Sequence, residues 1–193
     1  MLDQLSFKGQ WRQYQQRVLD KSESFMDDGK IHLVSSPGSG KTTLGIGFIR
    51  RFGNPTLILV PTVTIRQQWV DRIKQAFLSN ANQAEQLISQ DLKRPKMITV
   101  ATYQALHSAM NQVVGDGLIE DTDDTAQQEH FNFQDFDIRK TFEDKDLGTL
   151  CLDECHHLRN EWWKSLEIPG SLRWVMGRHC PMWTLLRVNP RPP

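Results

Sequence analysis

The sequence lacks most of the features that would assign it to a specialised class of protein. Three cysteines in 193 residues are an odd and small number, which argues against a secreted disulfide framework. Lysine plus arginine equals aspartate plus glutamate at 23 each, so no excess of positive charge points to nucleic acid by itself. No run approaches the roughly 20 apolar residues of a membrane-spanning helix. The N-terminus (MLDQLSFKGQ) has no charged lead before an apolar stretch, so we expect no signal peptide and a cytoplasmic protein.

Short apolar runs alternate with amphipathic stretches over most of the chain. The runs predict strands at 31–34, 56–60, 97–100 and 148–152, and the amphipathic stretches predict helices at 10–20, 42–52, 64–78, 102–113 and from 161. The second run (TLILV) has no polar alternation, which is typical of a strand covered on both faces. This alternation predicts an α/β fold, with a mainly parallel sheet and helices on both faces, over residues 1–170.

Two segments interrupt this pattern. Residues 115–146 are acidic and rich in turn residues, with little helical or strand periodicity, and we expect a solvated, partly disordered insertion there. A role in autoinhibition or partner binding is the alternative. Residues 171–193 mix Trp, Arg, Met and Pro without a clear period, and we expect an irregular tail rather than another βα unit.

A glycine-rich loop lies between the first predicted strand and the helix that follows it. Its sequence, SSPGSGKTT over residues 35–43, predicts a P-loop that binds ATP. The glycines allow backbone N–H groups to turn toward phosphate oxygens, and the helix N-terminus adds partial positive charge. Lys41 would reach the β- and γ-phosphates and Thr42 would bind Mg²⁺. The full candidate set for the nucleotide is Ser36, Pro37, Gly38, Ser39, Gly40, Lys41, Thr42 and Thr43; a serine replaces the first glycine of the strict pattern.

Two adjacent carboxylates follow the predicted strand at 148–152. We expect Asp153 to hold Mg²⁺, directly or through water, and Glu154 to orient and deprotonate the attacking water. An ordinary strand end with two surface acids is the alternative, and the P-loop favours the catalytic interpretation. Zinc is a further alternative, although the spacing offers no C-x-x-C pair. Its candidate ligands would be Cys151, Cys155, His156, His157, His179 and Cys180.

The segment DECHH, residues 153–157, resembles motif II of superfamily-2 helicases of the DEAD/DEAH-box type, in the DECH variant. RQYQ at 12–15 resembles the element before the P-loop in type III restriction-enzyme-like helicases. The resemblance covers about residues 11–166 and implies the N-terminal, RecA-like ATP-binding domain of such an enzyme. It further implies that Gln15 reads the adenine edge.

Two further elements occur in the order that this family shows. VPT at 60–62 with QQW at 67–69 resembles motif Ia, and VATYQ at 100–104 resembles motif Ib. In this family both elements touch the nucleic-acid backbone. The resemblance therefore implies that nucleic acid is contacted by Pro61, Thr62, Gln68, Thr102 and Tyr103. It tilts the substrate toward DNA over RNA and suggests restriction or repair partner subunits.

The sequence also departs from the family. No Ser/Thr-Ala-Thr motif III follows DECH, and no second RecA-like domain with an arginine finger is present. An arginine finger contributes about 10³- to 10⁵-fold in rate, so we expect little hydrolysis and no unwinding from this chain alone. We hypothesise a truncated helicase product whose tail is read out of frame. A P-loop ATPase that regulates without touching nucleic acid, and a non-catalytic nucleotide-binding remnant, are the alternatives.

Overall fold

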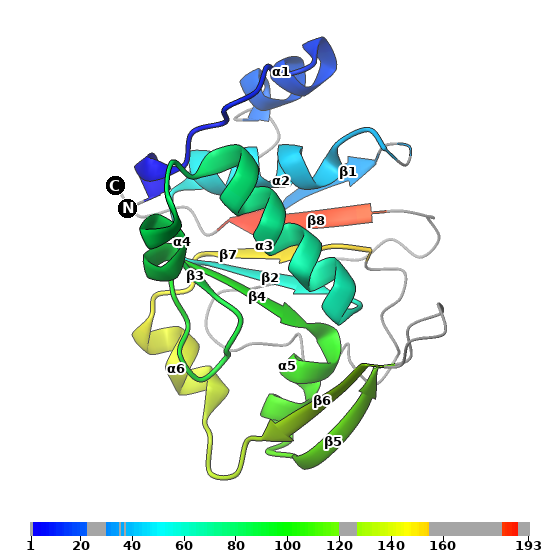
Figure 1. Cartoon of the computed structure of the whole chain (residues 1–193), viewed down its shortest axis with the longest axis vertical. Helices are drawn as coiled ribbons and strands as arrows, with labels where there is room; N and C mark the ends of the chain where they lie inside the picture. The colour runs from blue at the N-terminus through cyan, green and yellow to red at the C-terminus, as the bar shows by residue number, and fades with distance from the viewer. Residues whose placement is uncertain are drawn as a thin grey trace.

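The computed structural model describes residues 2–22, 30–34, 36, 38–119, 127–154 and 183–188. Its centre is a six-stranded sheet in the order β1-β8-β7-β2-β4-β3 (Figure 1). The strands are β1 (Lys30–Val34), β2 (Thr56–Val60), β3 (Ile88–Ser89), β4 (Ile98–Thr102), β7 (Thr149–Leu152) and β8 (Trp183–Val188). β7, β2, β4 and β3 pair in parallel, whereas β8 is antiparallel to both β1 and β7.

Side chains on both faces of the sheet are buried. Ile58 and Val60 of β2 belong to one apolar cluster and Leu57 and Leu59 belong to another, as expected for a strand covered on both sides. The first cluster includes residues of α2 (Lys41–Phe52) and α3 (Val63–Phe77), and the second includes residues of α5 (Tyr103–Met110) and α6 (Ile138–Asp144). The predicted α/β architecture, with a mainly parallel sheet and helices on both faces, is confirmed.

Local sequence explains where several helices begin. The Thr62 hydroxyl accepts a hydrogen bond from the Ile65 N–H (3.1 Å) at the start of α3. The Thr102 hydroxyl accepts one from the Ala105 N–H (3.1 Å) at the start of α5. Such caps satisfy N–H groups that have no partner within the helix. The described residues also form the helices η1 (Leu2–Gln4), α1 (Gln13–Asp20) and α4 (Ala81–Leu87), of which η1 and α4 were not predicted.

Regular structure occupies much of the predicted insertion. β5 (Val114–Ile119) and β6 (Gln127–Asn132) form an antiparallel hairpin, and α6 follows. Three phenylalanines are buried here: Phe131 on β6, Phe133 just after it and Phe142 on α6. The expectation of a solvated segment does not hold for Phe131, Phe133 and Phe142, because these spaced phenylalanines between acidic residues contribute to the second apolar cluster.

The predicted irregular tail also contains a strand. β8 lies between β1 and β7, and its backbone pairs with both of them. A strand in this place satisfies the backbone hydrogen-bonding groups that β1 and β7 would otherwise leave without partners. The expectation of an irregular tail is wrong for β8, and the other residues of 171–193 lie outside the described part. In the described residues, no helix has the length and apolarity required to cross a membrane.

Candidate functional site

The glycine-rich loop joins β1 to α2 and adopts a backbone that depends on its glycines. Gly38 has φ +73° and Gly40 has φ +88°, both in the left-handed region that other residues rarely enter. Gly40 is also the N-cap of α2, so the first N–H groups of this helix lie at the end of the loop. The loop and helix thus have the form predicted for a phosphate-binding site. Pro37 lies outside the described residues.

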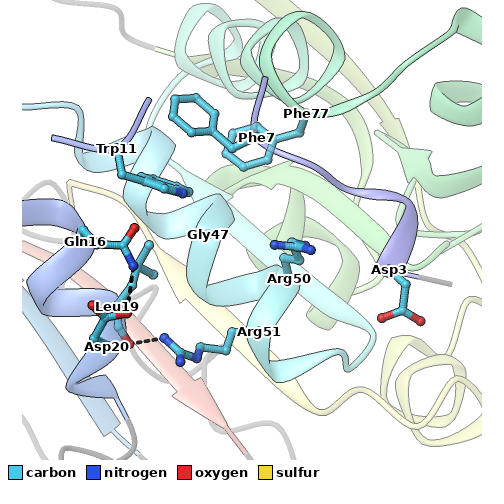
Figure 2. Close-up of a pocket in the computed structure, with 10 residues that line it drawn as sticks. All are labelled: Asp3, Phe7, Trp11, Gln16, Leu19, Asp20, Gly47, Arg50, Arg51 and Phe77. Carbon is cyan, nitrogen blue, oxygen red and sulfur yellow. Dashed lines mark hydrogen bonds between the residues drawn. The ribbon is translucent and has the colours of Figure 1, made fainter. Parts of the chain in front are cut away.

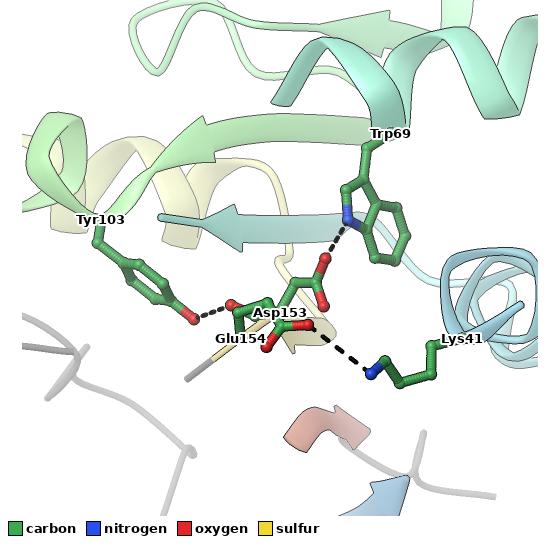
Figure 3. Close-up of polar contacts among 5 residues, drawn as sticks. All are labelled: Lys41, Trp69, Tyr103, Asp153 and Glu154. Atoms are coloured by element: carbon green, nitrogen blue, oxygen red, sulfur yellow. Dashed lines mark hydrogen bonds and ion pairs between the residues drawn. The ribbon is translucent and has the colours of Figure 1, made fainter. Parts of the chain in front are cut away.

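The acidic pair lies beside this loop. The Lys41 Nζ atom is 3.7 Å from the Glu154 Oε1 atom, and both side chains are partly buried, at 12% and 24% exposed (Figure 3). Glu154 has φ +50°, a left-handed conformation that is uncommon for glutamate and marks a sharp turn after β7. The fold therefore brings the P-loop lysine together with a carboxylate that lies more than a hundred residues later in the chain.

Asp153 is held by three hydrogen bonds from different elements. The Trp69 Nε1–H group on α3 donates to Asp153 Oδ2 (2.6 Å), and the Tyr103 hydroxyl on α5 donates to the Asp153 carbonyl (2.9 Å) (Figure 3). The Asp153 N–H donates to the carbonyl of Leu59 on β2 (2.9 Å). With 6% of its surface exposed, Asp153 is a buried carboxylate of defined orientation. Trp69 belongs to the QQW element that resembles motif Ia, but nothing in the sequence indicates that it bonds to Asp153.

Gln15 lies in a different environment from the one predicted. It is 4% exposed, its Oε1 atom accepts from the Arg12 N–H (3.1 Å), and its Nε2 group donates to the Ser39 carbonyl (3.3 Å). Arg12 Nη1 and the Tyr14 hydroxyl also donate to the Ser39 carbonyl. In this structure the Gln15 amide is buried against the P-loop, and its contact with adenine stays a prediction. The ring of Tyr14, on the same helix as Gln15, is exposed.

The proposed contacts to nucleic acid separate into two groups. Thr102 and Tyr103 are 0% and 1% exposed, and their hydroxyls bond inside the protein. These two side chains are used for helix capping and for Asp153, and their contact with nucleic acid stays a prediction. Pro61 and Thr62 are partly exposed at the start of α3, and Gln68 is exposed one turn further on.

The possible ligands for a metal ion are oxygen atoms. Thr42 is partly exposed on the first turn of α2, whereas Thr43 is buried, and Asp153 lies beyond the end of β7. Within the described ranges, no group of three His, Cys, Asp or Glu side chains could hold a metal ion. Of the residues considered for zinc, Cys151 is buried and the others lie outside the described part. One carboxylate and a hydroxyl suit Mg²⁺, which keeps several waters and is usually completed by phosphates.

A cavity of about 410 Å³ lies behind the P-loop helix, between α1, α2 and the N-terminal segment (Figure 2). Phe7, Trp11 and Phe77 contact one another at one end, with ring centroids 4.3 to 6.2 Å apart. Arg51 donates to the carbonyl of Leu19, which ties α2 to α1. The aromatic contacts and this bond anchor α1, and hence the residues that hold Ser39.

A P-loop, a lysine paired with the second of two adjacent carboxylates and a mainly parallel sheet together define a RecA-like P-loop nucleotide-binding domain. The chain matches the family described as "Type III restriction enzyme, res subunit" over residues 8–172. It therefore belongs to this family of helicase-type ATPases, and it carries their motor domain.

Individual relatives carry helicase names. The chain is 29% identical over 153 residues to a Halobacterium salinarum protein named "Putative DNA 3'-5' helicase Rad25", covering 78% of this chain and 20% of the relative. A Haloarcula marismortui protein of the same name is 29% identical over 148 residues, which cover 76% of this chain and 19% of the relative. An African swine fever virus protein named "Putative ATP-dependent RNA helicase QP509L" is 38% identical over 63 residues, covering 32% of this chain and 12% of the relative. The chain thus spans a fifth or less of each of these relatives.

Proposed function

We propose that this motor domain binds ATP with Mg²⁺ and supports hydrolysis that is coupled to the remodelling of DNA. The observation that carries the proposal is the approach of Lys41 Nζ to Glu154 Oε1 at 3.7 Å, directly beside the buried Asp153. A lysine and two carboxylates gathered at the end of a P-loop match the requirements of phosphoryl transfer, which depends on positioning and on charge stabilisation.

Each of these side chains has a distinct role in the proposal. Lys41 neutralises charge on the β- and γ-phosphates, and the ion pair with Glu154 keeps it beside the loop before ATP arrives. Glu154 accepts a proton from the attacking water and orients that water toward the γ-phosphate. Thr42 and Asp153 hold Mg²⁺, which supplies positive charge to the phosphate oxygens when bound. Ser36, Gly38, Ser39 and Gly40 shape the loop around the phosphates.

Nucleic acid would lie across the beginning of α3. Pro61, Thr62 and Gln68 are accessible there, at the carboxyl edge of β2 and on the side of the sheet that carries Asp153. A backbone contact near the start of α5 would complete this surface. The resemblance to type III restriction enzymes favours DNA over RNA, and restriction or repair subunits would be suitable partners. A cytoplasmic location stays a prediction.

The proposal is tested by nucleotide binding to the purified chain. A fluorescent ATP analogue is titrated in Mg²⁺ or EDTA while its anisotropy is followed, with Lys41→Ala as the test variant. Lys140→Ala is the matched control, since Lys140 is exposed on α6. We expect Lys41→Ala to weaken binding at least tenfold, a loss of about 1.4 kcal/mol or more, and Lys140→Ala to leave it unchanged. Absence of binding to the unmodified chain would refute the proposal.

The second measurement concerns nucleic acid. ATP hydrolysis and nucleotide affinity are recorded with duplex DNA, single-stranded DNA and RNA of equal length. A response to DNA in either quantity supports the proposal. If nucleotide binds but neither its affinity nor its hydrolysis changes with any of the three nucleic acids, the result would instead favour a regulatory ATPase that does not act on nucleic acid.

A further inference from the structure

The Trp69 side chain lies between the two halves of the nucleotide site. Its indole is 1% exposed, and its N–H group donates to Asp153 Oδ2 at 2.6 Å. The other side of the indole faces the P-loop helix, where a Cβ atom added at Gly45 would lie 3.0 Å from the ring atom Cη2. Gly45 follows Lys41 by one helical turn, so the ring bridges the helix of the P-loop and the acidic pair.

The hydrogen bond between Trp69 and Asp153 determines the orientation of the Asp153 carboxylate. A buried indole N–H needs an acceptor, and a buried carboxylate needs donors to offset its lost hydration. Because the acceptor is a carboxylate, the bond is charge-assisted and stronger than one between neutral groups. The ring itself is fixed by packing against α2, so the direction in which Asp153 presents its carboxylate follows from the position of α3.

The same helix carries the proposed contacts to nucleic acid. α3 is capped by Thr62, and exposed Gln68 immediately precedes buried Trp69. Because α3 is a rigid element, a shift caused by nucleic acid at its first turns would move Trp69 as well. The hydrogen bond from Trp69 would then pass this shift to Asp153.

We propose that Trp69 is a positioning residue for the metal ligand Asp153 and that it links the nucleic-acid end of α3 to Mg²⁺ at the nucleotide site. This inference rests on the proposed function of the site. Trp69 touches neither nucleotide nor metal in this scheme; it acts through the carboxylate that it holds.

The test uses Trp69→Phe in the full chain, which retains an aromatic ring and removes the N–H donor. A labelled ATP analogue is followed by anisotropy with direct excitation of the label, so that loss of an indole does not change the signal. Phe142→Leu is the control, because it shortens a buried aromatic side chain in the second apolar cluster and touches neither Asp153 nor the P-loop among the described contacts. The measured quantity is the ratio of the Kd in EDTA to the Kd in Mg²⁺.

We expect Trp69→Phe to reduce this ratio about tenfold, as loss of a partner behind a metal ligand commonly does. The Kd in EDTA should change less than twofold, because the P-loop does not depend on this bond. Gly45→Ala keeps the donor but displaces the ring by a few tenths of an ångström, so it should give a smaller loss of the same kind. It also provides the test should Trp69→Phe fail to fold.

Duplex DNA supplies the second readout. In the unmodified chain, DNA should change the affinity for the Mg²⁺-bound analogue, and Trp69→Phe should remove most of that change. An unchanged Mg²⁺ ratio in both variants, or a DNA effect of equal size with and without Trp69, overturns the inference while the proposed function stands. Failure of the unmodified chain to bind the analogue overturns both.

Discussion

Replacing Gln15 with alanine separates two roles for this residue. The resemblance to helicases implies that its amide reads adenine, whereas the structure places that amide against the P-loop, bonded to the Arg12 N–H and the Ser39 carbonyl. If Gln15 reads adenine, its replacement should weaken the binding of ATP alone. If Gln15 holds the loop, its replacement should weaken the binding of every nucleotide whose phosphates the loop binds.

The size of the effect follows from the bonds lost. Two hydrogen bonds of 3.1 and 3.3 Å disappear, and a third, longer contact of 3.5 Å to the Gly40 carbonyl goes with them. At about 1 kcal/mol for each of the two shorter bonds, the ordered loop loses about 2 kcal/mol. If the loop must be ordered to bind phosphates, this corresponds to an affinity about 30-fold weaker.

The assay is competition of ATP, GTP and inorganic triphosphate against a fluorescent ATP analogue. Gln15→Ala should weaken all three by similar factors and leave the ratio of ATP to GTP affinity unchanged. Gln16→Ala is the matched control, because its amide is exposed and bonds only to Asp20 among the contacts seen (2.8 Å). A loss confined to ATP, with GTP and triphosphate unaffected, would show that Gln15 reads adenine and that the structural interpretation is wrong.

Three further substitutions test the loop, the acidic pair and the second apolar cluster. Gly40→Ala forces alanine to φ +88° with its Cβ 2.8 Å from Gln15 Nε2, so nucleotide affinity should fall at least about tenfold; Gly53→Ala has similar strain but nothing within 4 Å, and should bind normally. Glu154→Gln should retain Mg²⁺-dependent nucleotide binding but lower the hydrolysis rate about 10²-fold or more; equal rates would exclude Glu154 as the base. Phe142→Ala should cost about 3 kcal/mol in urea unfolding, since Phe142 is 3% exposed, whereas a solvated segment would show no loss.

Much of the site could be predicted because its chemistry lies in short, continuous stretches. The P-loop needs glycines, a lysine and a threonine within a few residues between a strand and a helix, and all of these are neighbours in the chain. Asp153 and Glu154 directly follow an apolar run, so their place at the end of β7 also follows from adjacent residues. β2 was predicted with its observed bounds because it is buried on both faces.

The sequence did not predict the surroundings of polar side chains whose burial depends on distant elements. Gln15 and Tyr103 occur at positions where the family contacts its ligands, yet each is buried and bonded inside the protein. The β5–β6 hairpin and α6 were missed because their acidic residues outweigh the phenylalanines in composition. Those phenylalanines stabilise the fold because α5 and β4 supply an apolar surface on which they can pack.

Local sequence is sufficient to define the P-loop, the acidic pair and the alternation of strands and helices. These depend on backbone preferences, helix capping and apolar periodicity, which act between residues close in the chain. The tertiary structure alone decided that β8 enters the sheet between β1 and β7, that Gln15 holds the loop, and that Trp69 holds Asp153 across 84 residues. Such contacts arise where separately formed elements pack together, and their partners are set by shape and burial rather than by spacing along the chain.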